Sequence, residues 1–196
     1  MSLTRRTALT LGLALLAIPA RAQVPRPDPA TLRAALGRGG LLIGFRHGRT
    51  SRGGVDSADW PRERQRLLSP EGEAQARAVG AAFRRNGWVA DPVQASPLYR
   101  CREYAEIAFG DVTPLDELTG LLTDQTARDP RAAYARAMVR QPVAAGRNRV
   151  VVTHTSNMRE AVGLTLDEGG AAIIRPAAGG AELIAVLDAP DDWDRL

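Results

Sequence analysis

The sequence contains no lysine, one cysteine and two histidines among 196 residues. Its 26 basic residues are therefore all arginine, which we attribute to genomic base composition rather than to a binding surface. A single cysteine, Cys101, excludes an internal disulfide, and we expect it to pack in a helix rather than act as a nucleophile. The sequence also contains no internal repeat and no low-complexity segment.

The first 22 residues have the layout of a cleaved export signal. Arg5 and Arg6 precede an apolar run over residues 8–18, and the small residues Ala20 and Ala22 follow it. The run is too short to span a bilayer, and no cysteine follows it as a lipid anchor would require. The paired arginines also resemble a twin-arginine signal, whereas the alternative is an N-terminal helix packed on the domain. We expect a soluble periplasmic or secreted protein without stable membrane insertion.

Removal of this leader changes the charge of the protein. Cleavage after Ala22 removes Arg5, Arg6 and Arg21 but no acidic residue, so the net charge falls from +4 to +1. A nearly neutral mature protein argues against a nucleic-acid partner.

The rest of the chain is predicted to form one domain. Residues 23–38 read as a proline-rich linker and a short helix, and residues 39–196 are long enough for a single continuous core. Strand patterns alternate with helical patterns, which predicts a three-layer α/β/α fold with a mostly parallel central sheet. The strands are expected near residues 41–45, 93–96, 149–153, 171–174 and 182–187, and the helices near 30–36, 69–86, 97–108, 129–140 and 157–164.

The connection from residue 49 to residue 67 is long, polar and irregular, which is typical of a functional loop. Its arginines at 62, 64 and 66 read as a solvated face, with the entry path of an acidic substrate as the alternative. Trp60 reads as a packing residue, with a substrate platform as the alternative.

Both histidines follow a predicted buried strand. Arg46-His47 continues the strand at 41–45, and His154 follows the strand at 149–153. Because the carboxyl ends of parallel strands meet at one edge of a sheet, the two imidazoles are predicted to face one pocket. A structural role for each ring and a metal site are the alternatives. Arg46 would repel a cation, however, and no cysteine or carboxylate adjoins His154.

The residues near the histidines can donate hydrogen bonds to an anion. Arg100 lies on the first turn of a predicted helix, where free N–H groups, the helix dipole and a guanidinium all favour phosphate oxygens. For the neighbours of the two histidines, structural and substrate-binding roles are equally open. The candidate substrate-binding residues among them are Arg49, Thr50, Thr155 and Ser156.

Four segments together resemble the histidine phosphatase superfamily, which has the phosphoglycerate mutase-like fold. They follow the family's order and cover most of the mature chain. The segments are Arg46-His47-Gly48-Arg49-Thr50, Leu68-Ser69-Pro70-Glu71-Gly72 with Gln75-Ala76, Ser96-Pro97-Leu98-Tyr99-Arg100, and Val152-Thr153-His154.

This resemblance implies a catalytic mechanism. His47 would attack phosphorus and become a phosphohistidine that water hydrolyses. It must be neutral at the attacking nitrogen, with the other nitrogen hydrogen-bonded to a backbone carbonyl. Arg46, Arg100 and a protonated His154 would neutralise the charge on the phosphoryl oxygens, without a metal or other cofactor.

The family resemblance also implies a proton donor for the leaving group. In the mutase-like branch this is a glutamate after the second arginine, which points to Glu117, with Asp116 and Asp124 behind it. The other branch has an aspartate directly after the second histidine, where this chain has Thr155. Some small members act without an evident acid on substrates whose leaving group is good.

We therefore expect an exported phosphomonoesterase that acts on a small phosphorylated substrate or a phosphorylated envelope glycan. The alternative from another class is a non-catalytic module of the cell envelope that binds phosphate or a polyanion in the same pocket.

Overall fold

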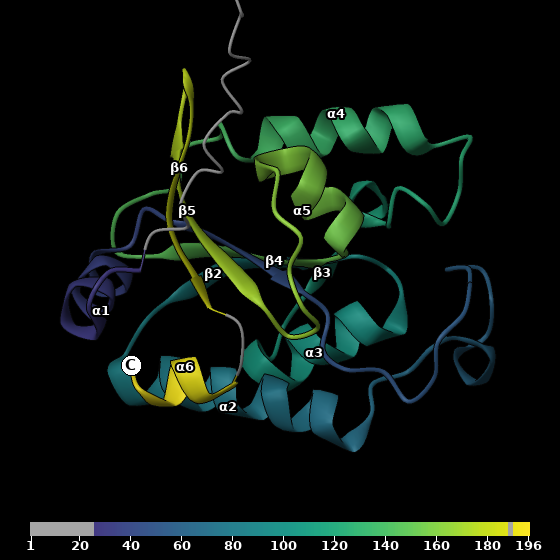
Figure 1. Cartoon of the computed structure of the whole chain (residues 1–196), viewed down its shortest axis with the longest axis horizontal. Coiled ribbons are helices and arrows are strands. Elements are labelled where there is room, and N and C mark those ends of the chain that lie inside the picture. The colour runs from purple at the N-terminus through teal and green to yellow at the C-terminus, as the bar shows by residue number, and fades with distance from the viewer. Residues whose placement is uncertain (1–25, 188–189) are drawn as a thin grey trace, which may run out of the picture.

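The computed structural model describes residues 26–187 and 190–196. The predicted export signal lies outside these residues. A six-stranded sheet is covered by helices on both faces (Figure 1), which confirms the predicted three-layer fold. Of the helices in the described ranges, none is both long and apolar enough to cross a membrane.

The elements follow the predicted order along the chain. The helices are α1 (Pro29–Arg38), η1 (Arg62–Arg64), α2 (Pro70–Asn86), α3 (Tyr99–Phe109), η2 (Asp116–Leu118), α4 (Arg128–Met138), α5 (Thr155–Val162) and α6 (Pro190–Asp194). The strands are β1 (Leu42–Arg46), β2 (Ala90–Ala95), β3 (Thr113–Pro114), β4 (Asn148–Thr153), β5 (Ala171–Ala177) and β6 (Gly180–Leu187).

The sheet has the strand order β3-β2-β4-β1-β5-β6. β1, β2, β3 and β4 are parallel to one another, whereas β5 and β6 form an antiparallel hairpin beside β1. The parallel strands β2, β4 and β1 are therefore neighbours, and their carboxyl ends meet at one edge.

Side chains of the central strands alternate between two apolar layers. In β1, Leu42 packs beneath α4 and α5, whereas Ile43 and Phe45 join the larger core beneath α2 and α3. Val151 and Val152 of β4 alternate in the same way. Burial on both faces explains why these strands read as continuous apolar runs.

Two helix starts match their capping signals, and four short elements, η1, η2, β3 and α6, were not predicted. The Asp28 carboxylate caps α1, and the Ser69 hydroxyl accepts from the Gly72 amide at the start of α2. Strand β3 and helix α6 are too short to show a periodic pattern. Trp193 nevertheless anchors α6, because it is fully buried and stacks on Phe45 with ring centroids 5.6 Å apart.

Candidate active site

The register of the sheet brings the two histidines together. Arg46 of β1 pairs with Thr153 of β4, and the His47 amide continues the ladder by donating to the Thr153 carbonyl at 3.0 Å. His47 and His154 therefore leave the sheet at the same level. Their ring centroids lie 5.4 Å apart in an edge-to-face arrangement.

His47 is held as a neutral imidazole with one free nitrogen. Its Nδ1 lies 2.9 Å from the Gly48 carbonyl oxygen, which can only accept, so Nδ1 carries the proton and Nε2 keeps its lone pair. Burial, followed by the positive charge of Arg100, lowers the pKa of His47 well below 6.5. The predicted hydrogen bond to a backbone carbonyl is thus present, and Nε2 is available as a nucleophile.

His154 is fixed by polar neighbours on both ring nitrogens. Nε2 lies 2.9 Å from the Ser96 hydroxyl, and Nδ1 lies 3.5 Å from Nη2 of Arg100. Burial, then Arg100 and His47, lowers the pKa of His154 well below 6.5. These neighbours therefore favour a neutral ring, whereas a bound phosphate dianion would favour the protonated form that the family resemblance implies.

Three guanidinium groups surround the histidines. Arg46 donates to the Leu166 carbonyl at 2.9 Å, and both Arg46 and Arg66 lie 3.5 Å from the Glu168 carboxylate. Arg100 forms a 2.7 Å ion pair with Asp56, and both side chains are at most 4% exposed. Asp56 and Glu168 therefore offset part of the charge of the three arginines.

Several hydrogen-bond donors near the pocket have no protein partner. Within the described structure, the Nε groups of Arg46 and Arg100 and the hydroxyl of Thr155 are buried without a hydrogen-bond partner. Buried donors are rarely left unpaired, because the lost hydrogen bond costs about 1–3 kcal/mol. All three residues line the same pocket, so one bound anion can satisfy several of these donors.

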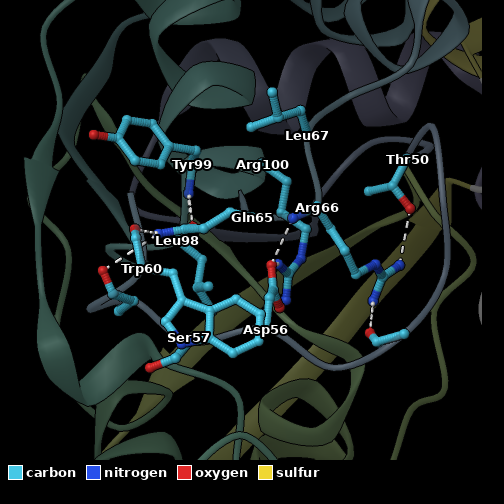
Figure 2. Close-up of polar contacts among 12 residues, drawn as sticks. Thr50, Asp56, Ser57, Trp60, Gln65, Arg66, Leu67, Leu98, Tyr99 and Arg100 are labelled. Atoms are coloured by element: carbon cyan, nitrogen blue, oxygen red, sulfur yellow. Dashed lines mark hydrogen bonds and ion pairs between the residues drawn. The ribbon is translucent and has the colours of Figure 1, made fainter. Parts of the chain in front are cut away.

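The long loop between β1 and α2 forms one wall of this pocket, and Figure 2 shows its polar contacts. Oδ2 of Asp56 accepts from the Arg66 amide at 2.8 Å and from Nη1 of Arg100 at 2.7 Å. The buried side chain of Gln65 donates to the Trp60 carbonyl and accepts from the Tyr99 amide at the start of α3. The loop is thereby attached to the helix that carries Arg100.

Two glycines allow backbone segments to approach the histidines. A Cβ on Gly48 would lie 2.9 Å from the Gly72 carbonyl oxygen and from the Tyr104 ring, so this glycine serves close packing of α2. A Cβ on Gly120 would lie 3.2 Å from the His154 ring. Glycine is therefore required at position 48, and a side chain at position 120 would press on the His154 ring.

The resulting pocket has a volume of about 250 Å³. It holds the two histidines and three arginines at the edge where β1, β4 and β2 end. Its lining consists of Arg46, His47, Gly54, Val55, Asp56, Arg66, Arg100, Gly120, Leu122, Thr123, His154, Thr155 and Ser156.

Two of the four predicted substrate-binding residues lie elsewhere. Arg49 is exposed and does not line the pocket, and its amide donates to Gln75. The Thr50 hydroxyl accepts from Nη2 of Arg66 at 2.8 Å and stabilises the loop (Figure 2). Thr155 and Ser156 do line the pocket, although the Ser156 hydroxyl already accepts from the Leu121 amide at 3.0 Å. The structure therefore does not bring Arg49 and Thr50 to the pocket.

The structure does not bring the predicted proton donor to the pocket. Glu117 lies exposed on η2 and is not part of the lining, because Leu118 and Thr119 occupy the inward positions of this segment. Asp116 and Asp124 both face Arg131, at 3.4 and 3.8 Å. In the described part of the chain, Asp56 is the only carboxylate that lines the pocket.

Sequence reasoning missed Asp56 and Arg66. The long polar loop was the signal for a functional segment, but an irregular backbone has no periodicity that fixes side-chain direction. Arg62 and Arg64 remain exposed as expected, whereas Arg66 turns inward beside Asp56. Trp60 does not line the pocket and instead packs against Arg64, with the guanidinium 4.7 Å from the ring centroid.

Across residues 26–187 and 190–196, no group of three or more histidine, cysteine, aspartate or glutamate side chains is arranged to hold a metal ion. The polar groups of the pocket are instead mostly cationic donors, which suit an anion.

Comparison with solved structures identifies proteins of the same fold. The protein histidine phosphatase SixA, solved with tungstate, is 17% identical, with a TM-score of 0.58 over 78% of this chain and 98% of that one. The alpha-ribazole phosphatase from Shigella flexneri is 18% identical, with a TM-score of 0.52 over 76% and 96%. A phosphoserine phosphatase mutant from Entamoeba histolytica, solved with phosphoserine, is 15% identical, with a TM-score of 0.53 over 74% and 95%.

Sequence comparison gives a family match for part of the chain. No curated protein matches the sequence. Residues 42–122, which include Arg46, His47 and Arg100, match the family model described as histidine phosphatase superfamily (branch 1). Together with the shared fold, this match over residues 42–122 supports the assignment to the histidine phosphatase superfamily.

Proposed function

We propose that this protein is a phosphomonoester hydrolase that transfers the phosphoryl group to Nε2 of His47. The proposal rests on the protonation state and the position of the His47 ring. Its Nδ1 is bonded to the Gly48 carbonyl, its pKa is held well below 6.5 by burial and Arg100, and it lines a pocket that three arginines share. A neutral, oriented imidazole in a cationic pocket suits nucleophilic attack on an anionic phosphate.

The reaction would proceed in two steps. The lone pair of Nε2 forms a bond to phosphorus while the ester P–O bond breaks, and that electron pair leaves on the alcohol oxygen. A water oxygen then attacks phosphorus, the P–N bond breaks, and its electron pair returns to Nε2. The proton lost by water balances the proton gained by the released alcohol.

The charges of the pocket suit a phosphate dianion. Arg46, Arg66 and Arg100 contribute three positive charges, and Asp56 and Glu168 contribute two negative charges. The remaining charge is +1 while both histidines are neutral, so a dianion would be attracted. In the transition state, the guanidinium groups would stabilise the equatorial oxygens, and loss of one such donor should cost about 3–4 kcal/mol of barrier.

The proton donor is the weak point of the pocket. Asp56 accepts two hydrogen bonds on the same oxygen, one from the Arg66 amide and one from Arg100, so its carboxylate is already engaged by protein donors. Both nitrogens of His154 face protein groups, Ser96 and Arg100. We therefore propose that the enzyme acts best on substrates whose leaving group departs without a proton.

The names of the structural relatives support a phosphorylated substrate without identifying one. They include a protein histidine phosphatase, an alpha-ribazole phosphatase and a phosphoserine phosphatase, which differ in the group that carries the phosphate. We propose a small phosphorylated compound, with a phosphorylated envelope glycan as the larger alternative. We also propose a periplasmic or secreted location, which fractionation of cells that express the tagged full chain would test.

The competing function is a phosphate-binding module without turnover, and the position of Glu117 outside the pocket favours it. Hydrolysis of a generic aryl phosphate by the purified protein, in buffer treated with chelator, separates the two. We expect turnover, and loss of turnover in His47→Ala. Phosphate binding without hydrolysis of any activated phosphoester would instead favour the binding module.

A further inference from the structure

Two exposed apolar side chains lie at the mouth of the catalytic pocket. Val55 is 80% exposed and Leu122 is 74% exposed, and both line the pocket that holds His47. The exposed large hydrophobic residues of the described chain include one more, Val89, which does not line this pocket. Single exposed apolar residues are ordinary on a surface, but two at one active-site entrance require an explanation.

The backbone that carries each side chain is anchored. Val55 precedes Asp56, whose carboxylate is held by Arg100 and by the Arg66 amide. Leu122 follows Leu121, whose amide donates to the Ser156 hydroxyl. These contacts place both apolar groups beside the phosphate-binding arginines before a substrate arrives.

The chemistry of the pocket restricts the group that can leave. The Asp56 carboxylate is paired with Arg100, and Glu117 lies outside the lining, so neither is placed to give a proton to the departing oxygen. A phenol has a pKa near 10, well below that of an alkyl alcohol, so a phenolate leaves more readily without protonation. An aromatic ring also presents apolar faces that can cover Val55 and Leu122.

We infer that Val55 and Leu122 form the leaving-group subsite, and that the substrate is a phosphomonoester of an apolar aromatic alcohol. This inference rests on the proposed phosphatase function and adds the class of substrate. A polyol such as a glycan would place hydroxyl groups against two side chains that offer no hydrogen bond, and would lose hydration there.

The test compares two aryl phosphates of matched leaving-group acidity, one with a butyl chain on the ring and one with a hydroxylated chain of the same length. We expect kcat/KM to favour the butyl compound by about tenfold. The double variant Val55→Ser/Leu122→Ser should reduce this preference to about twofold or less. The control Val89→Ser changes an exposed apolar side chain outside the pocket and should retain the full preference.

A third substrate, an alkyl phosphate with a hexyl chain, tests the aromatic requirement and should be hydrolysed far more slowly than either aryl compound. Equal rates for the butyl and hydroxylated compounds, a preference that survives the double variant, or rapid hydrolysis of the alkyl phosphate would each overturn the inference while leaving the phosphatase function intact. Absence of hydrolysis of every compound would overturn both.

Discussion

Removal of the Asp56 carboxylate should destabilise the protein, and phosphate should restore part of the loss. Asp56 and Arg100 form a 2.7 Å ion pair in which both side chains are at most 4% exposed. Breaking a buried pair by removing one partner leaves an uncompensated charge and costs about 3–5 kcal/mol. We therefore expect Asp56→Ala to lower the free energy of unfolding by about that amount.

Phosphate distinguishes this electrostatic effect from a packing defect. In Asp56→Ala, Arg46 and Arg66 keep the Glu168 carboxylate but Arg100 loses its ion-pair partner, so a bound dianion replaces the missing negative charge. A tenfold gain in phosphate affinity would add about 1.4 kcal/mol of ligand stabilisation relative to the wild type at saturating phosphate.

The assay is urea unfolding at neutral pH, with and without saturating phosphate. The control is Glu182→Ala, which breaks an exposed ion pair with Arg175 and should cost about 0–1 kcal/mol with no dependence on phosphate. If Asp56→Ala were no less stable than this control, or if phosphate stabilised Asp56→Ala no more than wild type, the charge balance described for the pocket would be refuted.

Four further predictions concern three single residues. Burial and Arg100 hold the pKa of His47 well below 6.5. The acid limb of the pH profile of kcat/KM, corrected for substrate ionisation, should therefore lie well below pH 6.5. An acid limb at or above pH 6.5 would contradict a neutral His47 ring. Below pH 6.5 the unfolded chain binds a proton on His47 that the native protein excludes, so the free energy of unfolding should fall as the pH drops below 6.5. The same urea titration should show a smaller fall in His47→Gln. Glu117→Gln should change kcat by less than about twofold, because the side chain lies outside the pocket. A loss of about a hundredfold in steady-state assays would instead show that Glu117 is the proton donor. Burial raises the pKa of Cys101 to about 12, so iodoacetamide should label the native protein only after unfolding, and rapid labelling seen by mass spectrometry would disprove this burial.

The sequence predicted the parts of the site that regular structure positions. His47 and His154 follow buried strands whose apolar runs are clear, and parallel pairing of those strands fixes where the two rings lie. Arg100 was predictable because the helix start after Pro97 fixes its place on the first turn.

Residues on irregular segments could not be placed in the same way. Arg66 turns into the pocket because Gln65 and Asp56 bind distant backbone groups, and no local pattern encodes those contacts. Glu117 had the expected position in the chain, but the short turn of η2 directs Leu118 inward and leaves the glutamate exposed.

The most direct test of the account is detection of the covalent intermediate on His47. Rapid mixing with an aryl phosphate, quenching in alkali and mass spectrometry of the digest should show one phosphoryl group on the peptide that contains His47. The modification should be lost in acid and absent from His47→Ala. Turnover of the substrate with no phosphorylated His47 at any time, or retained turnover in His47→Ala, would contradict the proposed mechanism.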